Sequence, residues 1–193
     1  MASADEKLFL WINGWVGTWP LFDRFITWVV SDYLVPVTFA LVLVALWFSG
    51  RDPQERLRNQ VGVFVAMSSM ALASLAVFIS NALYFRPRPF TDHPVSLLFY
   101  QPTDSSFPAN AMAATFAVAA AVWKLDRRVS LLLYAGAALY AFARVYAGVH
   151  YPVDVVAGGL IGVVVAWGVW RLRDLLEPLP TWVIKAFRIL CLA

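Results

Sequence analysis

The sequence has few charged residues: Asp, Glu, Lys and Arg make up 14% of its 193 positions, whereas 61% are hydrophobic. A soluble globular protein fits this composition poorly, because such proteins carry about 25% charged residues. The single cysteine, Cys191, excludes an internal disulfide and a cysteine metal cluster. Residues 1–6 contain no basic n-region, so we do not expect a cleaved signal peptide there.

Apolar runs without a charge are abundant instead. They cover residues 61–83, 109–123, 129–143 and 155–170. A helix that spans a membrane needs about 20 mostly apolar residues, and flanking residues extend the shorter runs toward that length. Nine tryptophans, many near the ends of runs, are typical of the aromatic belts at membrane interfaces. We therefore predict an all-α polytopic membrane protein with five or six transmembrane helices, rather than a soluble bundle with buried core helices.

The N-terminal segment departs from this regular pattern. Gly14, Gly17 and Pro20 interrupt its first apolar stretch. Two arrangements fit: residues 6–18 form an interfacial amphipathic helix, or residues 6–31 form a broken first span.

The basic residues indicate the orientation of the chain. They cluster at Arg51, Arg56 and Arg58, at Lys124, Arg127 and Arg128, at Arg171 and Arg173, and at Lys185 and Arg188. Cytoplasmic loops carry an excess of Lys and Arg, which places all four clusters in the cytoplasm. Residues 86–107 and 144–151 are then on the outer side of a multi-pass protein of the cell (plasma or inner) membrane. The net charge of +3 lies mostly in short loops, so it does not indicate a nucleic-acid partner.

Several ionisable residues lie at these outer helix ends. Arg86 and Arg88 belong to the sequence FRPRPF, whose prolines stop a helix and keep the backbone extended. His150 and Asp154 are four residues apart, so they share one face of a helix. Simpler interpretations are arginines that extend to lipid headgroups and an acid in the first turn of a helix. These leave His150 and Arg144 at one membrane level unexplained, and ionisable groups at membrane depth are functional by default.

Together these residue types predict a phosphoryl-transfer site. Planar guanidinium groups are suited to binding phosphate oxygens. A helix that we expect to begin at Pro108 offers backbone N–H groups and the positive end of its dipole to an anion. A histidine oriented by a carboxylate, here His150 and Asp154, is a nucleophile for attack on phosphorus. This scheme uses His150 and Asp154 as nucleophile and orienting group rather than as metal ligands, so we expect neither a metal nor a cofactor.

The spacing of the last group matches the third motif of a known family. That motif is Ser-Arg, five residues, His, three residues, Asp, and here it reads Ala143-Arg144, His150 and Asp154. With it the sequence resembles the type 2 phosphatidic-acid phosphatase superfamily, membrane lipid phosphatases related to vanadium haloperoxidases. The FRPRPF segment and the small size most resemble the bacterial undecaprenyl-diphosphate phosphatases.

The other two motifs of that family are altered in this sequence. The first is Lys, six residues, Arg-Pro, and here Arg88-Pro89 fits while Asn81 takes the Lys position. The second is Pro-Ser-Gly-His, and residues 108–111 read Pro-Ala-Asn-Ala. From the extent of the resemblance we expect one membrane-embedded domain: residues 1–193, with 60–172 as its motif-bearing core and 1–30 as an interfacial segment or broken first span.

The resemblance implies a role for each matched residue. His150 is the nucleophile that forms a phosphohistidine, and Asp154 orients it. The implied phosphate-binding groups are Arg88, Arg144 and the backbone at Ala109, Asn110 and Ala111, with Arg86 and Asn81 as further candidates. The family's second histidine, the general acid, falls on Ala111 and is absent. His93 lies in the same outer segment and is an accessory candidate for that role.

The alanines at the second motif restrict the predicted activity. They reflect either natural divergence or deliberate truncation of catalytic side chains. A monophosphate ester must expel an alkoxide, so loss of the general acid costs about 10²–10⁴-fold, whereas a diphosphate has a better leaving group. We therefore expect metal-independent dephosphorylation of a membrane lipid phosphate, a polyprenyl (undecaprenyl) diphosphate, in a form that is impaired or inactive. The alternative is a non-catalytic lipid-phosphate binding or transport protein on the same fold; a vanadate-dependent oxidase fits less well, because those relatives are soluble.

Overall fold

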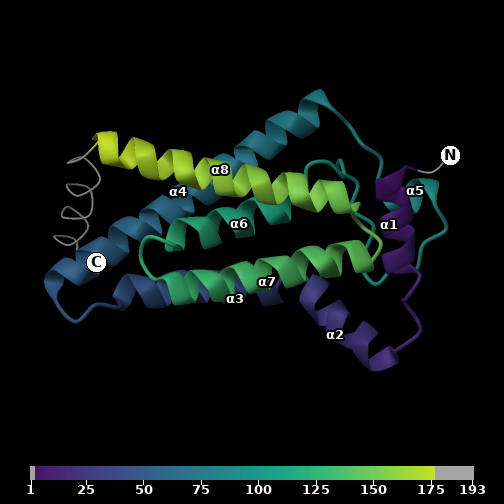
Figure 1. Ribbon diagram of the computed structural model, residues 1–193, viewed down its shortest axis with the longest axis horizontal. Helices are drawn as coiled ribbons and strands as arrows, with labels where there is room; N and C mark the ends of the chain where they lie inside the picture. The colour runs from purple at the N-terminus through teal and green to yellow at the C-terminus, as the bar shows by residue number, and fades with distance from the viewer. Residues whose placement is uncertain (1–2, 177–193) are drawn as a thin grey trace.

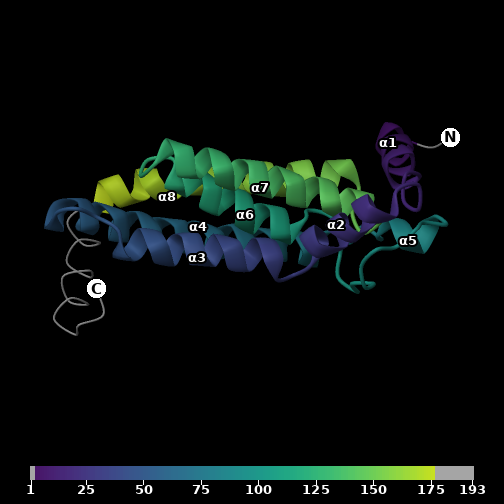
Figure 2. The ribbon, with the colours of Figure 1, turned by 90° about the horizontal axis from the view of Figure 1, so that it is seen from below.

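The computed structural model describes residues 3–176, which form an elongated bundle of helices (Figure 1 and Figure 2). In chain order the helices are α1 (Ala4–Asn13), α2 (Pro20–Val30), α3 (Leu34–Phe48), α4 (Pro53–Leu83), α5 (Pro89–Asp92), α6 (Asn110–Val122), α7 (Arg127–Tyr146) and α8 (Pro152–Leu176). No strand occurs within residues 3–176, so the all-α class predicted from the sequence is confirmed.

The spans can be assessed from helix length and composition. Among the described residues, α4, α7 and α8 are each long and apolar enough to cross a membrane. Helices α2 and α3 make a fourth span if the pair, bent by 51° at a short break, is counted as one. Helix α6 is apolar but has 13 residues, fewer than the roughly 20 of a full span. The five or six spans predicted from the sequence would need α6 as well, and that number stays a prediction.

Helix α1 lies across one end of the bundle, roughly perpendicular to the long helices (Figure 1 and Figure 2). A capping box formed by Ser3 and Glu6 starts it, and Gly14 ends it. Phe9 on its inner face is fully buried and packs edge-on against the ring of Tyr151. The same end holds α5, the segment 84–109 and the connection 147–151, and we call it the α1 end.

The beginning of α6 differs from the prediction. The sequence placed the helix start at Pro108, whereas α6 begins at Asn110 and Ala109 is its extended N-cap residue. The reason is a contact with α8: the backbone N–H of Ala109 donates to the carbonyl oxygen of Asp154 at 3.0 Å. The first turn of α6 is thereby fixed beside the first turn of α8.

Helices α6 and α8 approach closely through glycines. Small residues on one face of a membrane helix predict close packing, and here Gly158 and Gly162 form that face. A Cβ atom on Gly158 would lie 2.3 Å from the carbonyl oxygen of Ala109, and one on Gly162 would lie 2.4 Å from that of Ala113. Because both obstacles are backbone atoms, neither contact can be relieved by rotating a side chain.

We expect Gly162→Ala to destabilise the protein by about 1–3 kcal/mol, because the added methyl group overpacks the α6–α8 contact. Thermal unfolding in detergent, followed by tryptophan fluorescence, measures the effect. Gly168→Ala on the same helix is the matched control, since nothing lies within 4 Å of its added Cβ. An equal unfolding temperature for both variants would contradict the close approach of the two helices.

Candidate active site

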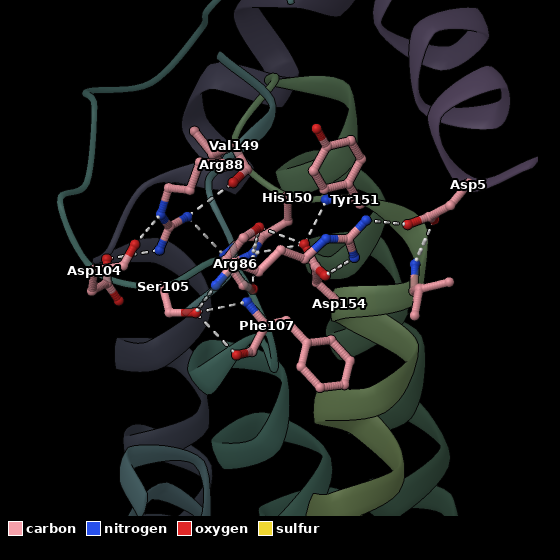
Figure 3. A network of polar contacts seen from close by, with 12 residues as sticks. Asp5, Arg86, Arg88, Asp104, Ser105, Phe107, Val149, His150, Tyr151 and Asp154 are labelled. Atoms are coloured by element: carbon pink, nitrogen blue, oxygen red, sulfur yellow. Dashed lines mark hydrogen bonds and ion pairs between the residues drawn. The ribbon is translucent and has the colours of Figure 1, made fainter. Parts of the chain in front are cut away.

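The predicted site residues come from three segments that meet at the α1 end. Arg86 and Arg88 lie in the extended segment between α4 and α5, and His150 lies in the short connection between α7 and α8. Asp154 is in the first turn of α8. Figure 3 shows the side chains of these four residues converging in one network. Arg88, His150 and Asp154 are all buried.

The His150 ring has a distinct partner at each nitrogen. Nδ1 lies 3.0 Å from the carbonyl oxygen of Ser106, and Nε2 lies 3.1 Å from Nη1 of Arg88. A carbonyl can only accept and a guanidinium can only donate, so the proton is assigned to Nδ1 and the lone pair to Nε2. His150 is therefore a neutral imidazole with its lone pair toward Arg88.

The charge state of the ring agrees with this assignment. Burial lowers the pKa of the His150 imidazole below its ordinary value, and the cationic Arg88 guanidinium lowers it further. Asp154 acts in the opposite direction without reversing the shift. The ring is thus unprotonated at neutral pH, as a nucleophile must be.

Asp154 reaches His150 less directly than the sequence predicted. Its Oδ2 is 3.9 Å from His150 Nδ1, beyond hydrogen-bond distance. Oδ2 instead accepts from the hydroxyl of Ser106 and from the backbone N–H of Tyr151, the latter at 2.9 Å. The carbonyl of Ser106 takes the position next to Nδ1 that the sequence assigned to the carboxylate.

Arg88 is buried and held on several sides. Its Nη1 donates to the carbonyl oxygen of Val149 at 2.9 Å, in addition to contacting His150. On the other side, Nε donates to the carbonyl oxygen of Asp104 and Nη2 to its carboxylate, at 3.0 and 2.8 Å. The Asp104 side chain is 63% exposed, so this carboxylate lies at the solvent side of Arg88.

Arg86 faces a different set of partners. Its guanidinium forms ion pairs with the carboxylates of Asp154 and Asp5, the latter at 2.8 Å, and stacks over the ring of Tyr151 at 4.1 Å. Asp5 also accepts from the backbone N–H of Val153 at the start of α8. Arg86 therefore ties α1 to Asp154, and two carboxylates already surround it (Figure 3).

Arg144 at the end of α7 lies beside a carboxylate from the N-terminal part of the chain. Nη2 contacts Asp32 Oδ1 at 2.6 Å and the hydroxyl of Tyr140, and the guanidinium stacks over the ring of Phe99 at 4.6 Å. Asp32 is about half exposed. The Nε atom of Arg144 is buried and has no hydrogen-bond partner among the described residues. This arginine therefore keeps a donor for another group.

The positions of the altered motifs carry little side-chain chemistry. Ala109 is buried, Ala111 is half-buried, and Asn110 is exposed as the first residue of α6. The N–H groups at the start of a helix have no partner inside the helix, so those of Asn110 and Ala111 are anion-binding candidates. Near the end of α4, the Oδ1 atom of Asn81 is buried without a partner in the described structure. No hydrogen bond joins Asn81 to the other predicted site residues within the described part.

His93, the accessory candidate, follows α5. Its ring makes an edge contact with the ring of Tyr151, with centroids 6.3 Å apart. Tyr151 is also the residue over which Arg86 stacks. His93 thus lies on the Arg86 side of the network.

The sequence interpretation missed several polar residues that complete the site. They are Asp5, Asp32, Asp104, Ser106 and Tyr140. Asp104 and Ser106 belong to the polar run 103–106, one residue before the second motif, and that run is a detectable signal. Asp5 and Asp32 are 81 and 112 residues from the arginines that they contact, and no local pattern marks them.

Comparisons with known proteins identify a family and relatives. The model of a family described as the PAP2 superfamily matches residues 62–177, more than half of the chain. The undecaprenyl-diphosphatase BcrC of Bacillus subtilis (strain 168) is 28% identical over 82% of this chain and 79% of its own length. The putative undecaprenyl-diphosphatase YbjG of Escherichia coli (strain K12) is 28% identical over 94% and 91%, respectively. The crystal structure of Aquifex aeolicus LpxE superposes with a TM-score of 0.68 at 27% identity, covering 88% of this chain and 96% of that one.

Proposed function

The chain belongs to the PAP2 superfamily, and from this premise we propose that it removes a phosphate group from a polyprenyl diphosphate through a phosphohistidine at His150. The family and the relatives make the chain a lipid phosphatase, a hydrolase of membrane lipid phosphates. Two relatives carry the name undecaprenyl-diphosphatase, which favours a polyprenyl diphosphate as the substrate here. The chain's apolar helices support a multi-pass membrane location.

One observation carries the proposal: the unprotonated Nε2 of His150 lies 3.1 Å from the buried guanidinium of Arg88. A phosphate that takes over this Arg88 donor is brought next to Nε2, the ring nitrogen that carries the lone pair. Arginine is suited to this because its planar fork matches phosphate oxygens. Attack at phosphorus then needs no movement of a proton onto or off Nε2.

We assign the remaining phosphate contacts to Arg144 and to the first N–H groups of α6. In the free protein the carboxylates of Asp104 and Asp32 contact Arg88 and Arg144. Both carboxylates are exposed although the arginines are buried, so each carboxylate can return to water when another anion takes its place. Phosphate oxygens, which bind a guanidinium through two charge-assisted hydrogen bonds, can replace them. Arg86 keeps its two carboxylates and acts as a structural link, which departs from the phosphate-binding role expected from the sequence.

The reaction follows from these positions. Nε2 of His150 attacks the terminal phosphorus, the bond from that phosphorus to the bridging oxygen breaks, and the lipid monophosphate leaves. The Nδ1–H of the imidazolium stays hydrogen-bonded to the carbonyl oxygen of Ser106, while the buried Asp154 carboxylate stabilises the positive charge of the ring. Water then hydrolyses the phosphohistidine and releases inorganic phosphate. Because Ala111 offers no proton to the leaving group, a diphosphate is favoured over a monophosphate.

An apolar pocket next to the site supports the proposal that the substrate carries a long lipid tail. It has a volume of about 650 Å³ and lies between α3, α4, α6 and α7. Ala111 and Tyr140 line the end of the pocket nearest the site, and the Tyr140 hydroxyl contacts Arg144. At its other end are Trp47 and Phe48, about 18 Å along α3 from Pro36 at 1.5 Å per residue. A polyprenyl chain placed there would have its diphosphate at Arg144.

We expect the chain as it stands to release phosphate from C55 diphosphate in detergent, slowly, and faster than from C55 monophosphate. The rate should fall on the acid side, with a midpoint below about 6.5, the ordinary pKa of histidine. The sign follows from the lowered pKa of His150: only the neutral ring attacks, and burial keeps it neutral to lower pH. Phosphate release from each lipid, measured as a function of pH, gives both the substrate preference and the acid midpoint. C55 diphosphate that binds without any turnover would instead favour the second candidate function.

That second candidate is binding or transport of a lipid phosphate without hydrolysis. The observation that favours it is the loss of side-chain chemistry at Ala109 and Ala111. The nucleophile arrangement at His150 argues for the enzyme, because binding alone requires no neutral imidazole beside Arg88.

We further propose that the α1 end faces outward. The reason is the distribution of Lys and Arg, which cluster at the helix ends opposite the α1 end. In a Cys191→Ser background, Glu55→Cys should react with a membrane-impermeant maleimide only after the cells are permeabilised. Thr103→Cys, an exposed position near Asp104, is the matched control and should react in intact cells. The reverse pattern would overturn the orientation.

A further inference from the structure

We propose that Ser106 is a positioning residue that carries the influence of the Asp154 carboxylate to His150, an inference that rests on the proposed function of His150. Neither the three motifs nor the sequence interpretation assigned this serine a role. It lies between the two predicted catalytic residues, whose nearest atoms, Nδ1 and Oδ2, are 3.9 Å apart, too far for a hydrogen bond.

The contacts of Ser106 involve both its backbone and its side chain. Its carbonyl oxygen accepts from Nδ1 of His150 at 3.0 Å. Its hydroxyl donates to Oδ2 of Asp154, and the oxygen of this hydroxyl lies 3.5 Å from Nδ1 of His150. The backbone N–H of Ser106 donates to the carbonyl oxygen of Arg86 at 2.9 Å, which fixes the peptide in place. The result is a path from Nδ1–H through the hydroxyl to the carboxylate.

Burial makes this path effective. Ser106 and Asp154 are fully buried, and His150 is 3% exposed, so water does not screen the charges. The charged groups facing the cluster are Arg88 at Nε2, Arg86 at the carboxylate, Asp5 and Asp104 behind these arginines, and Arg144, which acts on the ring from the end of α7. When the ring becomes an imidazolium, the hydroxyl relays stabilisation from Asp154 across the 3.9 Å gap. Without the hydroxyl, the carbonyl still fixes the tautomer, but no hydrogen bond links the carboxylate to the ring and only its electrostatic attraction at 3.9 Å remains.

We expect Ser106→Ala to lower kcat for C55 diphosphate by about 10–100-fold, the effect of a lost hydrogen bond to a charged group, and to leave KM within about threefold. The acid limb of the pH profile should move to lower pH, because a less stabilised imidazolium loses its proton more easily. Ser105→Ala is the matched control: this neighbouring serine is also buried, but its hydroxyl contacts Arg86 N and Phe107 O. That variant should keep the parental kcat and pH profile. Ser106→Thr retains the hydroxyl and should recover most of the lost rate.

A double-mutant cycle with Asp154→Asn separates the relay from a structural role. If Ser106 transmits the effect of Asp154, the double variant loses no more than the worse single variant. Losses that multiply, or a Ser106→Ala pH profile equal to that of Ser105→Ala, would overturn the proposal. Should Ser106→Ala not fold, Ser106→Cys keeps the size with a weaker donor, and the same cycle and pH profile decide. An inactive parent protein would refute the proposed function itself. An active parent in which the rate losses of the two single variants multiply in the double variant refutes only the relay.

Discussion

Replacing His150 with alanine is expected to abolish phosphate release from a polyprenyl diphosphate, lowering kcat by about 10³–10⁶-fold, as loss of a catalytic nucleophile does elsewhere. The physical reason is that Nε2 is the unprotonated ring nitrogen, and its lone pair accepts from Arg88 until phosphate takes that donor. Initial rates of phosphate release in detergent measure the loss. His93→Ala is the matched control, because His93 is the other histidine of the chain and contacts Tyr151 rather than Arg88.

The same variant tests the covalent intermediate. Substrate labelled in its terminal phosphate should leave label on the parent protein after a rapid quench, in an adduct that is stable to alkali and labile to acid. The label should be absent from His150→Ala and present in His93→Ala. Full activity in His150→Ala would contradict the nucleophile assignment, and a strong loss in His93→Ala would show that His93 supplies the missing proton donor.

Much of the site follows from local spacing in the sequence. His150 and Asp154 are one helical turn apart, and Arg144 precedes them by a fixed interval, so a short segment contains three of the proposed groups. The prolines on either side of Arg88 predict an extended segment at the end of a helix, and this singles out Arg88 as a site candidate. The helical class followed from runs of apolar residues, because a membrane restricts such runs to helices.

The partners of those residues did not follow from local spacing. Asp5, Asp32 and Asp104 neutralise arginines that lie 16 to 112 residues away in the chain. Their placement depends on α1 crossing the end of the bundle and on the path of the loop before α6, and neither has a periodic signal. Sequence spacing also assigned Asp154 directly to His150, whereas the loop before α6 inserts Ser106 between them.

The electrostatics of the free site bear on how it discriminates between ligands. Arg86 is surrounded by Asp5 and the buried Asp154, whereas Arg88 and Arg144 are paired with exposed carboxylates. A ligand can therefore displace Asp104 and Asp32 without leaving a buried charge unpaired. It cannot displace Asp154 in the same way. In the proposed function, Arg88 and Arg144 are therefore the two arginines that bind phosphate, and Arg86 maintains the carboxylate behind His150.

Restoring side chains at the second motif is expected to raise the phosphatase activity. Ala111→His combined with Ala109→Ser should increase kcat by about one to three decades, within the range of a recovered general acid. Ala111 is the second residue of α6, next to the N–H groups proposed to bind phosphate. It is half-buried and lines the apolar pocket of about 650 Å³, so an imidazole has room there.

The gain should be larger for C55 monophosphate than for C55 diphosphate, because an alkoxide leaving group depends more on the proton. Phosphate release from both lipids, with the parent and the double variant side by side, measures the difference. Ala111→Phe in the Ala109→Ser background is the matched control, since it adds similar bulk to the pocket without a proton and should give no gain. His150→Ala should abolish activity in either background. If the double variant still binds both lipids and hydrolyses neither, the chain is a lipid-phosphate binding protein, and the geometry at His150 serves recognition alone.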